Sequence, residues 1–174
     1  MGIQFETDYN METLTAMAKS LRKTVRRKRS RRVHIFAAVV LVLSILTILA
    51  TVAGGEPLGA SGVVTLLAML VVILVSLFED KLNAWFARKR LLPGTEHAAA
   101  TFEEDGYVSA TGVTESRFSY AQIVAVAETA RYFVFALSSH HTQAYDKRTI
   151  RGGSVEDFRA FIAGKTGKLV ENIK

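Results

Sequence analysis

Two neighbouring histidines and an aspartate form the cluster most able to do chemistry. Imidazole and carboxylate groups bind zinc or exchange protons near neutral pH, and His140, His141 and Asp146 supply both types within seven residues. Adjacent residues on a strand point to opposite faces, so a turn is needed to bring the two rings together. Glu96 and His97 could supply further ligands, but nothing in their spacing requires them to join this cluster. We interpret the pair as solvated turn histidines, with a metal site as the alternative.

The remaining polar clusters also favour a protein without catalytic chemistry. Glu103–Asp105 is an acidic run at a predicted hairpin tip, where a solvated turn is the main interpretation and a calcium site the alternative. The sequence contains no cysteine, which excludes thiolate metal ligands and cysteine nucleophiles. It also contains no phosphate loop, GxSxG or HExxH motif. We therefore predict a non-enzymatic protein that needs no cofactor.

A basic loop in the C-terminal half has two interpretations. Arg131, Lys147, Arg148 and Arg151 would form a basic patch near a membrane if they met on one surface. A solvated loop is the simpler alternative.

The chain is organised around two apolar runs joined by a glycine-rich break. Val33–Ala53 has 21 residues without a formal charge, and Val63–Phe78 has 16, extended by residues 59–62. A helix rises about 1.5 Å per residue, so each run is suited to the roughly 30 Å hydrocarbon core of a bilayer. Residues 54–58 allow only a turn between them. The sequence thus predicts a transmembrane helical hairpin.

Basic side chains on both sides of this hairpin predict its orientation. Residues 22–32 hold eight Lys or Arg side chains, and Lys81 and residues 88–90 add more, whereas the connecting loop has none. An excess of Lys and Arg keeps flanking segments on the cytoplasmic side of a membrane. We expect a multi-pass protein of the inner (cytoplasmic) membrane of the cell, with both termini cytoplasmic and residues 54–61 outside.

The same cations have a second interpretation beyond fixing topology. Each Lys or Arg near an anionic surface contributes roughly 1 kcal/mol of binding, which favours contacts with anionic lipid headgroups. Nucleic acid is not expected, because no aromatic side chains are interleaved with the cations for base stacking. The predicted headgroup-contacting residues are Arg22, Lys23, Arg26, Arg27, Lys28, Arg29, Arg31, Arg32, Arg88, Lys89 and Arg90.

Small and hydroxyl-bearing side chains recur on one face of each apolar run. Such residues let membrane helices approach closely and hydrogen-bond to each other, so we expect the two faces to meet. A self-association interface or a lined pore would show the same pattern, but no ionisable residue lies in mid-membrane to serve an ion pathway. The predicted packing residues are Ser44, Thr47, Thr51, Ser61, Thr65, Ala68 and Ser76.

The segments that flank the hairpin are predicted to contain one strand and two helices. Ile3 and Phe5 alternate with polar residues, as in a half-buried strand. Asp8 or Asn10 then caps a helix that continues into the basic cluster. After the hairpin, the second apolar helix is expected to continue out of the bilayer until Pro93-Gly94 ends it.

The remainder of the chain is predicted to form short strands and a final helix. Strand-like runs recur at about ten-residue spacing, which is typical of an antiparallel meander. Ser154 and Asp157 resemble a capping box at the start of an amphipathic helix that includes Phe158 and Phe161. Turns are predicted at residues 104–106, 111–112, 129–131 and 138–141. We expect a curved sheet closed by one C-terminal helix.

The layout and several local motifs resemble the bacterial YcxB-like family. The matching motifs are Phe102–Gly106, Tyr120–Ile123, Glu128–Phe133, Asp146–Arg148 and Asp157–Phe161. The resemblance implies a pleckstrin-homology-like (PH-like) domain on a two-span anchor, and it carries no catalytic residues over. A complete domain of this type needs about seven strands, more than the C-terminal segment is predicted to hold. The strand at the N-terminus would then supply another, with the hairpin inserted after it.

Together these observations predict an α+β membrane protein: a transmembrane helical hairpin plus a small antiparallel β (PH-like) cytoplasmic domain closed by a C-terminal helix. The predicted segments are 1–32 (N-terminal strand and polybasic helix), 33–78 (hairpin), 79–94 (juxtamembrane helix) and 95–174 (β domain). The expected function is a non-enzymatic protein-interaction or lipid-surface module, with membrane lipids, an unidentified protein and a homo-oligomer as partners. Two alternatives are a subunit of an oligomeric transport or immunity system and a hydrolase built on the histidines.

Overall fold

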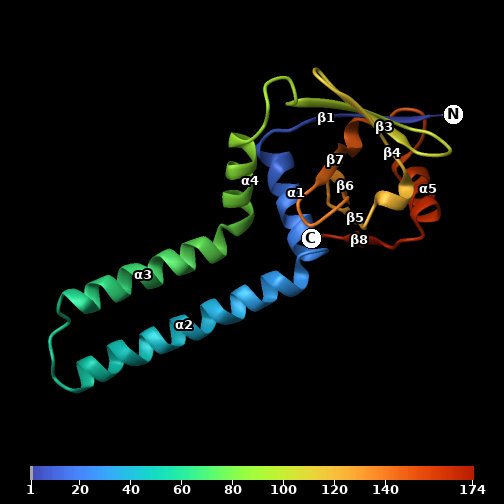
Figure 1. Cartoon of the computed structure of the whole chain (residues 1–174). Helices are drawn as coiled ribbons and strands as arrows, with labels where there is room; N and C mark the ends of the chain where they lie inside the picture. Colours follow the sequence, from blue (N-terminus) through green and yellow to red (C-terminus); the bar gives the residue numbers. More distant parts are fainter. Residues whose placement is uncertain (1) are drawn as a thin grey trace.

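The computed structural model describes residues 2–174 and shows an α+β chain with a long helical arm (Figure 1). Helices α2 (Arg27–Ala53) and α3 (Ala60–Leu77) lie side by side and project away from a β-rich body. Both are long and apolar enough to cross a membrane, and none of the apolar stretch of either is buried inside the protein. The two predicted apolar helices are thus present, with their side chains directed outward.

The helices do not run continuously into the arm, and the prediction was wrong on this point. Helix α1 (Met11–Lys23) ends in a turn, where the backbone N–H of Arg26 donates to the carbonyl of Leu21 at 2.9 Å. On the other side, Phe78 separates α3 from α4 (Glu79–Lys89). Glu79 and Asp80 favour a new helix start there, because acidic side chains stabilise the positive end of a helix dipole.

The β-rich body consists of two four-stranded sheets. The first has the order β1-β2-β3-β4 and is antiparallel throughout, and the second has the order β7-β6-β5-β8. The bounds are β1 Ile3–Asp8, β2 His97–Phe102, β3 Tyr107–Thr111, β4 Glu115–Phe118, β5 Ala125–Glu128, β6 Tyr132–Ala136, β7 Thr142–Asp146 and β8 Val170–Asn172, with α5 at Val155–Thr166. Short 3₁₀ turns, η1 and η2, occupy Tyr120–Gln122 and Lys147–Thr149.

Strand β8 departs from the predicted antiparallel meander, because it pairs parallel to β5. Its three residues carry no alternating pattern that sequence reasoning could recognise. Its position follows from the left-handed turn at Gly167, which ends α5 with a φ of 63° and reverses the chain. The backbone N–H of Ile173 then donates to the carbonyl of Glu128 at 2.7 Å.

The predicted N-terminal strand joins the β-rich body, which confirms the expected pairing. All six residues of β1 pair antiparallel with β2, from Ile3 opposite Phe102 to Asp8 opposite His97. Residues 9–96, which include the whole helical arm, are therefore an insertion between two paired strands. Both ends of that insertion must leave the body at the same end of the β1–β2 pair, where Asp8 lies opposite His97.

Strand β1 also supplies the centre of the hydrophobic core. Phe5 is 1% exposed, and its ring lies 4.7 Å from Phe158 of α5 and 5.8 Å from Phe102 of β2. It also contacts Phe133 and Tyr145, which belong to the second sheet. The side chain therefore joins both sheets to the C-terminal helix.

Helix α1 connects the body to the base of the arm (Figure 1). Asn10 caps it by accepting hydrogen bonds from the backbone of Glu12 and Thr13. One face, with Ala16 and Met17, packs against the second sheet, and another contacts α4, where Ala84 is fully buried. A small residue at this contact allows the two helix backbones to approach closely.

We expect Phe5→Ala to lower the free energy of unfolding by about 3–5 kcal/mol, because it opens a cavity shared by both sheets and α5. Thermal unfolding of the detergent-solubilised protein, followed by near-ultraviolet circular dichroism, measures the change. Gln4→Ala, at the exposed neighbouring position, is the control and should alter stability little. Equal melting of the two variants would show that β1 does not contribute to the core.

Candidate functional site

A groove of about 670 Å³ lies between α1, the start of α2, and α4. Four arginines line it, namely Arg22, Arg26, Arg29 and Arg90, and Glu79 is the one acidic residue among its lining side chains. Its floor is apolar and includes Leu14 and Leu21 of α1, and its rim includes Val33 and Phe86. We call it the arginine groove.

Three of the eleven predicted headgroup-contacting cations are held by the protein itself. Arg22 donates through Nε and Nη2 to Asp80 at 2.7 Å for each bond, so its guanidinium joins α1 to α4. Lys23 donates to the backbone carbonyl of Lys174 at 2.9 Å. Arg26 donates to the carbonyl of Ser139 at 2.6 Å and contacts Nδ1 of His140 at 2.9 Å. These contacts bind the base of the arm to the β-rich body.

The other eight cations are exposed and lie on the first turns of α2 and the last turn of α4. Lys89 lies over the ring of Trp85, with Nζ 3.7 Å from the ring centroid. Within residues 2–174, none of the eight forms a side-chain hydrogen bond or ion pair with the protein. They are Arg27, Lys28, Arg29, Arg31, Arg32, Arg88, Lys89 and Arg90.

The predicted helix-packing residues divide into two groups. Ser44 and Thr51 lie on the half-buried face of α2, and Thr65 and Ser76 lie on the half-buried face of α3. Thr47, Ser61 and Ala68 are exposed, so the structure does not bring them into the contact. The reason is angular: at about 100° per residue, Thr47 lies roughly 60° away from Ser44 around the helix.

The hydroxyl groups do not bond across the two helices. Thr47 donates to the carbonyl of Leu43 at 2.9 Å, and Thr65 donates to that of Ser61 at 2.9 Å. Thr51 and Ser76 likewise bond to the carbonyl four residues earlier in their own helices. A hydroxyl satisfied in this way presents little polarity to its surroundings. The predicted interhelical hydrogen bonds are therefore not formed.

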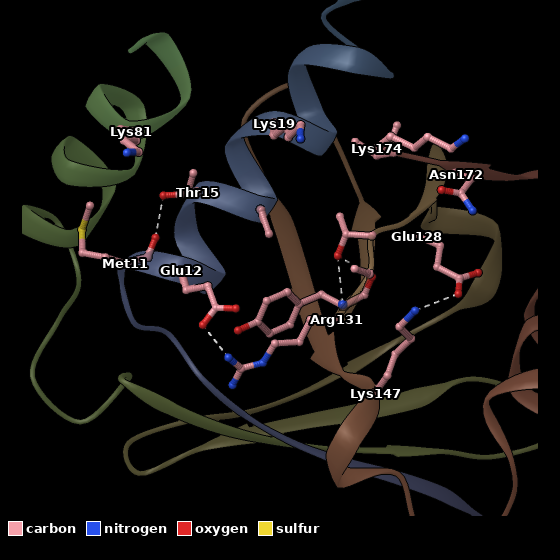
Figure 2. A pocket seen from close by; sticks show the side chains of 15 residues that line it. Met11, Glu12, Thr15, Lys19, Lys81, Glu128, Arg131, Lys147, Asn172 and Lys174 are labelled. Carbon is pink, nitrogen blue, oxygen red and sulfur yellow. Dashed lines mark hydrogen bonds and ion pairs between the residues drawn. The ribbon is translucent and has the colours of Figure 1, made fainter. Parts of the chain in front are cut away.

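The opposite side of α1 borders a second groove, of about 740 Å³, between α1, α4, the β5–β6 turn and the end of β8. Its walls are mainly apolar, and Figure 2 shows Lys19, Lys81 and Lys174 around its rim. Glu12 of α1 pairs with Arg131, and Lys147 pairs with Glu128 at 2.9 Å, so the charged side chains in its wall form internal pairs.

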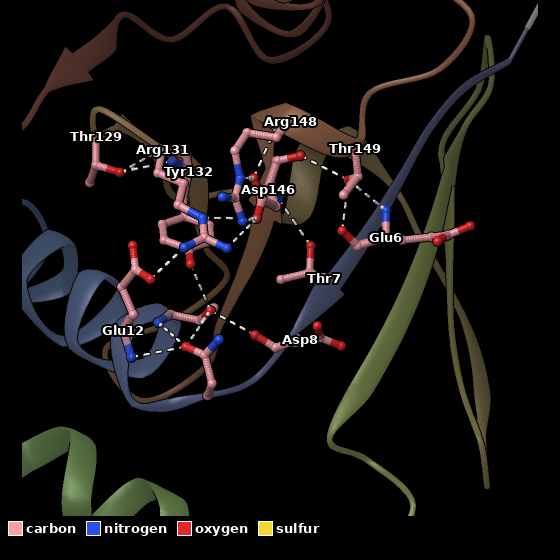
Figure 3. A network of polar contacts seen from close by, with 12 residues as sticks. Glu6, Thr7, Asp8, Glu12, Thr129, Arg131, Tyr132, Asp146, Arg148 and Thr149 are labelled. Atoms are coloured by element: carbon pink, nitrogen blue, oxygen red, sulfur yellow. Dashed lines mark hydrogen bonds and ion pairs between the residues drawn. The ribbon is translucent and has the colours of Figure 1, made fainter.

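A polar network fastens β1 and α1 to the second sheet (Figure 3). Asp146, which is 5% exposed, accepts from Arg131 at 2.9 Å and from Arg148 at 3.0 Å. Its backbone N–H donates to the hydroxyl of Thr7 at 3.0 Å. The hydroxyl of Thr149 bridges the carbonyls of Glu6 and Asp146. The buried carboxylate at the centre of the network is therefore satisfied by hydrogen bonds from the protein itself.

The predicted histidine cluster is not brought together. His140 contacts Arg26 and His141 lies edge-on to Phe118, whereas Asp146 faces the arginines of the network. His97, the further ligand considered, is 2.7 Å from Asp8. Across residues 2–174 no three His, Asp or Glu side chains are grouped to hold a metal ion.

Each of the four cations of the basic loop forms an ion pair within the body, although Arg148 and Arg151 remain exposed. Arg131 and Arg148 pair with Asp146, and Lys147 pairs with Glu128. Arg151 lies 3.3 Å from Glu6. Arg131, Lys147 and Arg151 thereby join elements that are distant in the chain, whereas Arg148 makes a local pair with Asp146.

Glu128 is the centre of a second buried set of charges. Its side chain is 8% exposed and accepts two hydrogen bonds from Arg159 of α5, at 2.6 and 2.8 Å, and one from Lys147. The Arg159 hydrogen bonds hold the pKa of Glu128 below its ordinary value of 4.5 although burial opposes the shift, and Lys147 lowers it further. The carboxylate thus fixes α5 and η2 against β5.

Comparison with known families identifies part of this architecture. The elements described above form an α+β body that carries a two-helix apolar arm. Within it, residues 102–162, from the end of β2 to Ile162 of α5, match the family model described as YcxB-like protein. No curated protein and no solved structure matches the chain. The match confirms the YcxB-like resemblance over this segment, which lies after the arm.

Sequence reasoning found the cations but missed the groove that some of them share. The residues come from α1, α2 and α4, and their meeting depends on the breaks at residues 24–26 and at Phe78. The ion pair between Glu128 and Arg159 was also missed, because the two residues lie 31 positions apart in the chain.

We expect acid to destabilise the protein partly through Glu128. Its pKa is lower in the folded than in the unfolded chain, so its contribution is present above about pH 4.5 and is lost as the pH falls through the folded-state pKa. Glu128→Gln should therefore melt at a lower temperature at pH 7 and lose less stability between pH 5 and pH 3, as measured by calorimetry.

Glu156→Gln is the matched control, because Glu156 lies 3.8 Å from the same Arg159 but is 76% exposed. It should melt like the parent protein at pH 7. Indistinguishable pH profiles for the parent and Glu128→Gln would contradict the role of Glu128.

Proposed function

We propose that the protein is a multi-pass protein of the bacterial inner membrane that holds a PH-like, non-enzymatic interaction domain against the cytoplasmic lipid surface. In this proposal α2 and α3 cross the bilayer as a hairpin, and both termini remain in the cytoplasm. The domain serves as a module for binding the lipid surface or a protein partner.

The distribution of charge along the helical arm carries the proposal. The eight exposed cations lie where α2 begins and α4 ends, next to the body, whereas residues 54–59 at the far tip contain Glu56 and no cation. Between these ends, large apolar side chains such as Leu46, Leu67 and Val71 are 55–57% exposed. An exposed apolar surface with cations at one end is suited to a bilayer and to a cytoplasmic position of that end.

The satisfied polar clusters of the body support a binding rather than a catalytic role. Asp146, Glu128 and their basic partners are committed to ion pairs between elements. The YcxB-like match covers residues 102–162 of this body, which include Asp146, Glu128 and Arg159. Two grooves beside α1, both close to the base of the arm, remain open for recognition.

Single-cysteine labelling in intact cells tests the proposed topology, since the sequence contains no cysteine of its own. We expect Glu56→Cys at the tip to react with a membrane-impermeant maleimide added outside the inner membrane. Asp105→Cys, in the β2–β3 turn, should react only after the membrane is opened. The reverse pattern, or equal labelling of both variants before lysis, would contradict the proposal.

A further inference from the structure

We propose that the arginine groove binds one anionic phospholipid, with Arg29 and Arg90 holding the phosphate and Val33 and Phe86 lying along the start of the acyl chains. This inference rests on the membrane placement proposed above and adds a specific site to it. It differs from a diffuse attraction between many cations and the membrane surface, because only some of the cations line the groove.

The position of the groove is suited to a lipid. Val33, on its rim, is the first residue of the uncharged run of α2, so the groove opens where the apolar part of the arm begins. Phe86 of α4 is 51% exposed on the same rim. A ligand that occupies this place meets both arginines and apolar side chains. A phospholipid has that combination of a charged phosphate and apolar chains.

The cations that would hold the phosphate have no competing partner in the protein. Arg29 lies in α2 and Arg90 directly follows α4, and within residues 2–174 neither makes a side-chain ion pair or hydrogen bond. Arg22 is occupied by Asp80, and Arg26 uses Nε and Nη2 for the β6–β7 turn. Guanidinium groups bind phosphate oxygens through short, charge-assisted hydrogen bonds, which makes an anion the complementary ligand.

The start of α2 adds to the excess of positive charge at this place. Its first turn contains basic residues and no acidic one, and no side chain caps it. Cations at the positive end of a helix dipole repel it, so this arrangement is unfavourable unless an anion lies nearby. A phosphate between Arg29 and Arg90 would offset the repulsion among these cations and their repulsion from the positive end of α2.

The groove is also connected to the β-rich body. Arg26, on its wall, contacts the carbonyl of Ser139 and the ring of His140 in the turn between β6 and β7. A lipid held beside Arg26 would therefore stabilise the position of the body relative to the arm as well as the arm itself.

Native mass spectrometry of the full chain in detergent tests the proposal, with phosphatidylglycerol and phosphatidylcholine as probes. Two double variants remove the same charge from the same two helices: Arg29→Gln/Arg90→Gln inside the groove and Arg31→Gln/Arg88→Gln outside it. All four side chains are exposed, so both variants should fold and melt like the parent protein. Removing two charge-assisted hydrogen bonds should weaken binding by about tenfold or more.

We expect the parent protein to retain one phosphatidylglycerol in preference to phosphatidylcholine. The groove variant should lose this preference, and the outside variant should keep it. Equal weakening of both double variants would overturn the proposal in favour of diffuse electrostatic attraction. Binding of soluble glycerol phosphate to the parent protein as tightly as phosphatidylglycerol would also overturn it, because the acyl chains would then contribute nothing and a soluble anion would be the occupant.

Incorporation of the same proteins into phosphatidylcholine nanodiscs separates this inference from the proposed function. If the parent protein enters these nanodiscs but shows no preference for phosphatidylglycerol in the native mass spectra, the lipid site is overturned and the membrane placement stays intact. A parent protein that stays soluble and monodisperse without detergent or nanodiscs would overturn both.

Discussion

The antiparallel pairing of β1 with β2 is the constraint on which the rest of the structure depends. These strands are neighbours in the sheet, although residues 9–96 separate them in the chain. Because the pairing closes the ends of this insertion, the two apolar helices must leave the body together. Phe5 makes the closure stable, since its ring packs against strands of both sheets and against α5. The arm is therefore part of the fold of the β-rich body and not a tail attached to it.

The base of the arm is held to the body by contacts around helix α1. Helix α1 lies between the second sheet and α4, and the bidentate Arg22–Asp80 pair joins the two helices at the base of the arm. Glu12 and Arg131 join α1 to the sheet, and Arg26 reaches the β6–β7 turn. These contacts distribute the connection over several points around one helix. A ligand bound beside α1, in either groove, would act directly on the junction between body and arm.

The parts of this structure that follow local patterns could be predicted from sequence. The uncharged runs, the turn at Glu104–Gly106 and the Ser154–Asp157 capping box all appear where their patterns indicate. The errors arose where a distant contact decides the outcome. The helix breaks near Arg26 and Phe78 allow α1 to pack on α4, and β8 depends on a chain reversal after α5. For the candidate site, the sequence identified the arginines, but only the packing of three helices shows which of them share a groove.

A designed disulfide tests the strand closure most directly. Gln4 exchanges its backbone hydrogen bonds with Arg151, so it faces Thr101 as a non-hydrogen-bonded pair, in which side chains lie close together. The chain has no other cysteine to interfere. In membranes from cells that produce the full chain, Gln4→Cys/Thr101→Cys should form a disulfide that blocks both thiols until reduction. Gln4→Cys/Ala99→Cys, which is two residues out of register, should keep its thiols reactive. Free thiols in both variants would contradict the closure and, with it, the description of the arm as an insertion between paired strands.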